Sequence, residues 1–226
     1  MLFVLGGMQG LIGWIMVKSG LNDENLYVNH YRLAIHFMAA MLLIGYTLIF
    51  ALSLTIPKEQ RIYNAHLRKF AITITVLLLV QLVYGCFMAG LKAASAAPTW
   101  PAINGSIIPD GLFKDGFSES ILHNTITIHF IHRTLAYIIF ILIIIWWRRA
   151  VKQKDSLAFN KVKKWPPILV SLQVVLGIIS VISSTSIVPG NFGLFEWFAE
   201  LHQLTGMLLL LSMLSVIYVI SSPVRK

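Results

Sequence analysis

The stretch TITIHFIHRTLAYIIFILIIIWW, residues 125–147, is a long apolar run that contains one formally charged residue, Arg133. About 20 mainly apolar residues in helical form cross the hydrocarbon core of a bilayer. The run is continuous and lacks the short alternating segments that are typical of barrel strands. It therefore predicts a helix that crosses a membrane.

The rest of the chain follows the same pattern. Of its 226 residues, 57% are hydrophobic and 12% are charged, whereas a soluble domain carries about 25% charged residues. Apolar segments of sufficient length occupy residues 1–17, 31–55, 70–91, 125–147, 166–187 and 199–221. The sequence predicts an all-α integral membrane protein with six transmembrane helices. Cys86 is the only cysteine, so an intrachain disulfide is excluded.

The net charge of +9 is unevenly distributed. Residues 56–69, 148–164 and 225–226 hold 13 of the 18 lysines and arginines, and the loops of the opposite side hold seven of the nine acids. Because basic loops stay on the cytoplasmic side, this pattern places both ends of the chain in the cytoplasm of a cell (inner) membrane. The Lys/Ile-rich composition favours a bacterial membrane over the mitochondrial inner membrane. Lipid headgroups are the expected partners of the basic loops, and a nucleic-acid partner is not expected.

The chain also contains an internal similarity. A Q-x-x-x-G pattern occurs at Gln9 and again at Gln173, and His36 and His202 are followed by the same Met-Leu-Leu triplet at the same offset. Such repeats are common in membrane folds. We therefore predict two related four-helix units. Residues 1–55 supply the last two helices of the first unit, 56–69 form an inner basic loop, and 70–226 form a complete second unit. We expect the first two helices of the first unit to be missing from this sequence.

Three histidines, His36, His132 and His202, lie a few residues inside the outer end of different apolar segments. Ionisable residues within the membrane are costly and usually functional. Alternate helices of an up-down bundle lie diagonally across its core, so His132 and His202 are expected to face each other. Hydrogen bonding between helices is the structural alternative for each histidine.

Two imidazoles that face each other in an apolar slot suit a haem better than a bare ion. Zinc takes three or four protein ligands, whereas haem iron needs one or two. Arg32 and Arg133 belong to the same outer layer and are expected to pair with haem propionates. His129 is expected to be structural or interfacial, and His30, His123 and His66 to be exposed. The long outer segment 92–124 is typical of a functional lid or interfacial loop.

These residues carry a family resemblance. The chain resembles heme A synthase of the type found in mitochondria and many Gram-negative bacteria. The matching stretches are GGMQGLIGWIMVKSGL (6–21), YRLAIHF (31–37), YGCFMAGLKA (84–93), PTWPAING (98–105), HFIHRTLAY (129–137), LQVVLGI (172–178) and ELHQLTG (200–206). They touch all six expected helices and the long outer loop, and their order makes the resemblance specific.

The resemblance implies eight transmembrane helices in two four-helix bundles, of which this chain matches the last six. It implies that His132 and His202 bind the iron of a haem b, and that His36 binds the iron of the substrate haem. The implied reaction oxidises a methyl group of haem O to a formyl group, giving haem A for terminal oxidases. A farnesyltransferase that produces haem O is the expected donor.

One family feature is absent. The E-x-x-H-R pattern of the family's first two helices does not occur here, and only its H-R part appears, at His132 and Arg133. The expected catalytic glutamate is therefore not in this sequence, and the chain alone is not expected to be a competent enzyme. Truncation and a second polypeptide both remain open, as does a homo-oligomer. The alternative functions are a non-catalytic bis-histidine haem b protein that transfers electrons and a proton-relaying transporter.

Overall fold

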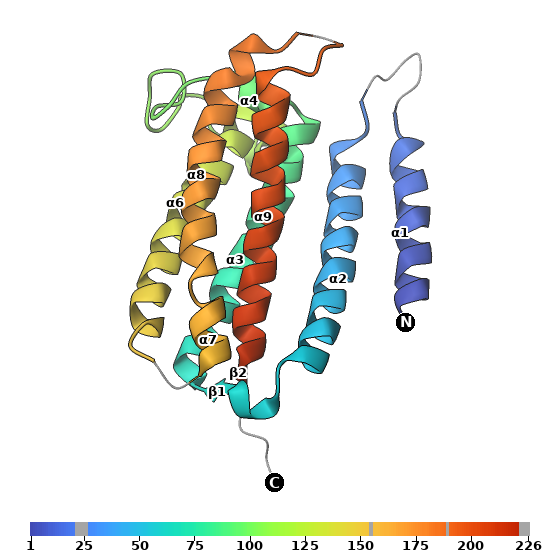
Figure 1. Ribbon diagram of the computed structural model, residues 1–226. Coiled ribbons are helices and arrows are strands. Elements are labelled where there is room, and N and C mark those ends of the chain that lie inside the picture. The colour runs from blue at the N-terminus through green and yellow to red at the C-terminus, as the bar shows by residue number, and fades with distance from the viewer. Residues whose placement is uncertain (21–26, 154–155, 189, 222–226) are drawn as a thin grey trace.

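The computed structural model describes residues 1–20, 27–153, 156–188 and 190–221 (Figure 1). The helices of these residues are α1 (Leu2–Val17), α2 (His30–Thr55), α3 (Ala65–Gly90), α4 (Ala93–Ala96), α5 (Phe117–His123), α6 (Thr125–Ala150), α7 (Leu157–Val162), α8 (Trp165–Ser183) and α9 (Leu194–Val219). Two 3-10 helices, η1 (Lys58–Gln60) and η2 (Ser184–Ser186), and two short strands, β1 (Ile62–Tyr63) and β2 (Ile220–Ser221), complete the described elements.

The apolar runs form the long helices that the sequence predicts. Four helices, α2, α3, α6 and α9, have 26 residues each, and the apolar stretch Leu157–Ser186 around α8 has 30. These five are long and apolar enough to cross a membrane. Helix α1 is apolar but has 16 residues, a length of about 24 Å at 1.5 Å per residue. The protein is an all-α, multi-pass membrane protein, and the predicted fold class is confirmed.

The helix ends differ from the apolar boundaries because polar residues cap them. Helix α3 begins five residues before the predicted position, where the side-chain oxygen of Asn64 accepts a hydrogen bond from the backbone N–H of Leu67 at 3.0 Å. Helix α9 also begins five residues early, where the carboxylate of Glu196 accepts from the N–H of Gly193 at 2.8 Å. Such caps satisfy N–H groups that have no partner within the helix.

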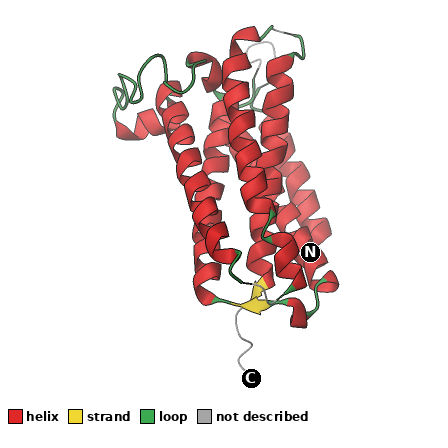
Figure 2. Ribbon diagram, turned by 60° about the vertical axis from the view of Figure 1, so that its left-hand side comes forward, coloured by secondary structure: helices red, strands yellow, loops and turns green. Residues whose placement is uncertain are grey.

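Four of the long helices form a bundle. In cyclic order α3 packs on α6, α6 on α8, α8 on α9, and α9 on α3. Helices α6 and α9 are therefore diagonal to each other. Helix α2 packs on α3 and α9, and α1 packs on α2 at the edge of the molecule (Figure 1). Figure 2 shows the same long helices side by side, with the extended outer loops gathered at one end.

The bundle core lies mainly in its inner half, toward β1 and β2. Ile74, Ile143, Trp146 and Met213 are fully buried there. The indole N–H of Trp146 donates to the backbone carbonyl of Leu67 at 3.1 Å, which satisfies its only polar atom. Between membrane helices, close van der Waals packing and hydrogen bonds provide the stability, because lipid is as apolar as the side chains.

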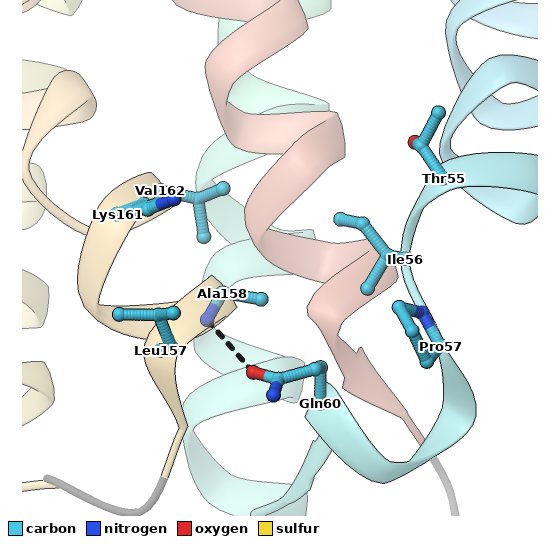
Figure 3. Close-up of a pocket in the computed structure, with 8 residues that line it drawn as sticks. All are labelled: Thr55, Ile56, Pro57, Gln60, Leu157, Ala158, Lys161 and Val162. Atoms are coloured by element: carbon cyan, nitrogen blue, oxygen red, sulfur yellow. Dashed lines mark hydrogen bonds between the residues drawn. The ribbon is translucent and has the colours of Figure 1, made fainter.

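The inner end is tied together by the segment that links α2 to α3. Strands β1 and β2 pair in parallel, with Ile62 opposite Ile220. The side-chain oxygen of Gln60 accepts from the N–H of Ala158 at 3.2 Å, as Figure 3 shows. A hollow of about 260 Å³ lies beside this contact, between the ends of α2 and α7. Its lining residues are Thr55, Ile56, Pro57, Gln60, Leu157, Ala158, Lys161 and Val162.

Candidate functional site

The diagonal helices α6 and α9 bring His132 and His202 together. Their ring centroids are 6.3 Å apart and the ring planes make an angle of 65°. The start of α6 sets this position, because the side-chain oxygen of Asn124 accepts from the N–H groups of Ile126 and Thr127 at 3.1 Å each. His132 then lies about two turns inside the helix and points at α9 across the bundle interior.

The separation of the two rings is the one that a shared metal ion requires. An imidazole nitrogen bonds a metal at about 2 Å and lies about 1.1 Å from its ring centroid, so two opposed imidazoles place their centroids roughly 6 Å apart. The observed 6.3 Å matches this value. Among the residues that the structure describes, no three His, Cys, Asp or Glu side chains gather as a metal site. A pair of imidazoles alone suits haem iron, which needs one or two axial ligands.

Each imidazole of the pair has a glutamine beside it from the neighbouring helix. On α8, the amide nitrogen of Gln173 lies 3.2 Å from Nε2 of His202, and the backbone carbonyl of Gln173 accepts from Nδ1–H of the same ring at 3.0 Å. A backbone carbonyl at Nδ1 is the usual partner of a metal-binding histidine, because it leaves the lone pair on Nε2.

On α3, Gln81 stands in the same relation to His132. Its amide nitrogen lies 3.3 Å from Nε2 of His132 and donates to the backbone carbonyl of that residue at 3.0 Å. Sequence analysis missed Gln81, although QLVYG at 81–85 is a third Q-x-x-x-G pattern. A glutamine within an apolar run was the available signal, because lipid penalises polar side chains.

His36 on α2 has an equivalent environment. The amide nitrogen of Gln9 on α1 lies 3.2 Å from Nδ1 of His36 and donates to the carbonyl of His36 at 3.1 Å. His36 is not part of the His132–His202 ring pair. The structure therefore brings His132 and His202 into one site and leaves His36 in a separate one.

A glycine one turn after each glutamine gives the imidazole room. A Cβ atom at Gly13 would lie 2.8 Å from Cε1 of His36, and one at Gly177 would lie 2.9 Å from Cε1 of His202. At Gly85 the corresponding distance to His132 is 3.5 Å, an ordinary contact. The Q-x-x-x-G pattern thus supplies an amide and a gap on the same helix face.

The two arginines of the outer layer, Arg32 and Arg133, donate hydrogen bonds to backbone carbonyls. The guanidinium of Arg133 donates to the carbonyls of Thr99, Pro101 and Ala102 at 2.9–3.2 Å, which pins the segment 98–105 to the end of α6. Arg32 donates to the carbonyl of Ile15 at 3.0 Å, which joins α2 to α1. Their expected contact with propionates stays a prediction.

The remaining histidines divide into buried and exposed ones. His129 is 1% exposed and lies 3.0 Å from the guanidinium of Arg133, in a structural position. The prediction that His30 is exposed was wrong. It is buried, because Gly90 packs directly against its Cβ and the ring of Phe87 lies 5.2 Å away. His123 and His66 are exposed, as expected.

The fold and the site define a class of protein: a multi-pass helical membrane protein with two histidines that face each other inside a four-helix bundle. The family within that class follows from sequence comparison. The chain belongs to the COX15-CtaA family, described as cytochrome oxidase assembly protein, which matches residues 1–214.

Several curated proteins named heme A synthase are similar to this chain. The protein of Paramagnetospirillum magneticum is 36% identical over 216 residues, which cover 92% of this chain and 57% of that protein. That of Parvibaculum lavamentivorans is 42% identical over 156 residues, 67% of this chain and 44% of the relative. That of Pelagibacter ubique is 33% identical over 222 residues, 96% of this chain and 60% of the relative. The chain spans about half the length of the curated relatives it matches.

Proposed function

We propose that this chain acts in heme A synthesis, oxidising a methyl group of haem O to a formyl group to give haem A for a terminal oxidase. The observation that carries the proposal is the pair His132 and His202, 6.3 Å apart across the bundle. The names of the similar proteins support the same activity. They do not favour a bis-histidine protein that only transfers electrons.

The residues present fit a haem b in the C-terminal bundle. His132 and His202 would hold its iron, and the lack of a Cβ atom at Gly177 leaves room for Cε1 of the His202 ring against α8. A haem b held by two histidines would supply one-electron transfer. The chain's own part is to fix the two imidazoles, keep Nδ1 of His202 on a backbone carbonyl and exclude water with apolar helices.

We assign the substrate haem to His36. Its imidazole has the same glutamine and glycine neighbours as the haem b ligands, and it lies outside the His132–His202 ring pair. The farnesyltransferase that produces haem O is our proposed donor.

Arg32 and Arg133 remain our proposed partners for the haem propionates. Each guanidinium has five N–H donors in a planar fork. Arg32 uses Nη1 on the carbonyl of Ile15, and Arg133 uses Nη1 and Nη2 on the outer segment and His129. The donors that remain lie in the same outer layer as the histidines, where a carboxylate pairs well with arginine.

The membrane orientation is also part of the proposal. The described residues of the basic segments 56–69 and 148–164 lie at the end of the bundle where β1 and β2 lie, and the outer segment with α4 lies at the opposite end (Figure 1). By the positive-inside rule, the basic end faces the cytoplasm in contact with anionic lipid headgroups. Both haem sites then lie toward the outer face of a cell (inner) membrane.

A product assay tests the proposal. The chain is produced in a bacterial membrane that makes haem O and lacks its own heme A synthase, and the extracted haems are separated by chromatography. Haem A above the empty-vector level supports the proposal. A purified chain that carries a low-spin haem b while only haem O accumulates agrees with the absence of the E-x-x-H-R pattern from this sequence, and the same assay on a full-length version of the protein then decides between the synthase and the electron-transfer protein. A chain that binds no haem contradicts both.

A further inference from the structure

The three glutamines at the imidazoles are not explained by helix packing alone. Gln9, Gln81 and Gln173 lie on three different helices, and each places its amide nitrogen 3.2–3.3 Å from a ring nitrogen of the histidine on the next long helix. A buried amide in an apolar helix is costly. Its recurrence at every one of the three intramembrane histidines of the proposed sites indicates a role at the rings.

Each of the three side-chain amides makes its contacts through its nitrogen and none through its oxygen within the described residues. The side-chain oxygens of Gln9, Gln81 and Gln173 are buried and have no hydrogen-bond partner within the described residues. A glutamine that served only as a bridge between helices would satisfy both ends of its amide. Here the N–H side points at the imidazole, and at Gln81 it also donates to the backbone carbonyl of His132. At Gln81 the position of the amide is therefore held independently of the ring.

The glycine of each pattern limits the ring from the other side. At Gly177 a Cβ atom would lie 2.9 Å from Cε1 of His202, closer than real Cβ contacts allow, so the ring rests against bare backbone. The imidazole of His202 is thus enclosed by an amide, a glycine and a carbonyl, all from α8. Rotation of the imidazole about its Cβ–Cγ bond would break at least one of these contacts.

We propose that Gln81 and Gln173 are positioning residues for the two imidazoles of the C-terminal haem site, and that Gln173 works with Gly177. The inference rests on the proposed haem between His132 and His202. In each pair the amide nitrogen lies beside Nε2, the ring nitrogen that would hold the iron, and so would restrain the ring near the present 65° angle between the two imidazole planes.

The test compares substitutions that remove the amide or the gap with controls that do not. Gln81→Met and Gln173→Met keep the length and volume of the side chain and remove the amide. Gly177→Ala pushes the His202 ring without touching the glutamine. Gln203→Met is the matched control, because Gln203 is an exposed glutamine next to His202 on α9. Gly85→Ala is the second control, since its Cβ would make an ordinary contact with His132.

Each purified full chain is reconstituted with haem b and examined in three ways. Haem loss to a soluble haem scavenger is timed, the midpoint potential is titrated, and the low-spin ferric signal is recorded by electron paramagnetic resonance. We expect haem loss to be about 10–100-fold faster in the two glutamine variants, the usual effect of removing a group that orients a metal ligand. We also expect a shifted potential and an altered low-spin signal in all three test variants, with both controls unchanged.

The outcomes separate the two proposals. A wild-type chain without low-spin haem overturns the haem site and this inference together. A wild-type chain with low-spin haem, and test variants that match it and the controls in all three measurements, overturns only the positioning role. If the glutamine variants fail to fold, as circular dichroism would reveal, Gly177→Ala decides. An unchanged low-spin signal in that variant overturns the inference, and an altered one supports it.

Discussion

Helices α1 and α2 and the bundle of α3, α6, α8 and α9 carry the same local arrangement and differ in what surrounds it. In both, a glutamine on one helix contacts a histidine on the next, with a glycine one turn further on. In the bundle two such histidines meet across the interior. In the α1–α2 pair His36 lies outside this ring pair, and α1 exposes most of its apolar side chains. The same local arrangement therefore occurs both inside a packed bundle and beside a helix whose apolar side chains are exposed.

The largest expected difference between the two regions concerns haem b. His132→Ala or His202→Ala should abolish the low-spin haem b spectrum of the purified chain, because one axial ligand is lost. His36→Ala should leave that spectrum intact and, in a full-length version of the protein, impair haem O conversion, since His36 belongs to the other proposed site. Absorption spectra of the reduced and oxidised chain measure the first effect, and chromatography of extracted haems measures the second.

The control for this comparison is His66→Ala, at an exposed position on the inner side of α3. It should leave both the spectrum and the product unchanged. Loss of haem b in His36→Ala would contradict the separation into two sites. Retention of the low-spin spectrum in both His132→Ala and His202→Ala would remove the ligand assignment.

Sequence patterns were sufficient to predict the long helices but not the contacts between them. The apolar run of 125–147 extends to Ala150 in α6, and five of the six predicted segments coincide with helices long enough to cross a membrane, whereas the sixth, residues 1–17, forms the shorter α1. Diagonal placement of His132 and His202 followed from helix order in an up-down bundle. The early starts of α3 and α9 were missed because their first turns contain polar residues such as Arg68 and Glu196, which resemble loop sequence.

The details of the site depend on tertiary contacts that no local pattern encodes. The environment of Arg133 is set by the segment 98–105, whose carbonyls reach it only after the outer loop folds back on α6. The burial of His30 depends on the close approach of Gly90, which is 60 residues away in the chain. Gln81 was within reach of sequence reasoning, since its spacing to Gly85 repeats that of Gln9 to Gly13.

A second difference between the two regions is the stability that their tryptophans provide. Trp146 in α6 is fully buried and its indole N–H is hydrogen-bonded, whereas Trp14 in α1 is 59% exposed. Trp146→Ala should lower the free energy of unfolding by roughly 3–5 kcal/mol, the usual cost of a large cavity in a packed core. Trp14→Ala should change it by less than about 0.5 kcal/mol, as exposed substitutions generally do.

Reversible unfolding of the reconstituted chain in detergent or bicelles measures both values. Equal losses for Trp146→Ala and Trp14→Ala would show that α1 is packed as tightly as the bundle. Trp146→Phe is the matched variant that keeps an aromatic ring and removes the N–H donor. It should fall between the wild type and Trp146→Ala, because the carbonyl of Leu67 loses its side-chain donor but the cavity stays largely filled.

The smallest expected difference distinguishes the two arginines. Arg133 donates to three carbonyls of the outer segment, and Arg32 donates to one carbonyl of α1. A hydrogen bond to a charged group contributes about 1.5–3 kcal/mol, and water near the outer end of α6 reduces that value. We expect amides of residues 98–106 to exchange roughly tenfold faster in Arg133→Ala, equivalent to about 1.4 kcal/mol. Hydrogen exchange followed by mass spectrometry measures this change.

Arg32→Ala is the control for this effect on the outer segment. It should leave the exchange rates of the 98–106 amides within about twofold of wild type while loosening only the last turn of α1.

The amides of 98–106 report on the segment because it has hydrogen bonds of its own. The backbone N–H of Ile103 donates to the carbonyl of Ser106 at 2.8 Å, and that of Ser106 donates to the carbonyl of Ile103 at 3.1 Å. The N–H of Asn104 donates to the Thr99 hydroxyl at 2.8 Å. These bonds persist only while the carbonyls of Thr99, Pro101 and Ala102 stay anchored. Unchanged exchange in Arg133→Ala would mean that the segment holds its own shape, and the guanidinium would then be free to serve a propionate without disturbing the loop.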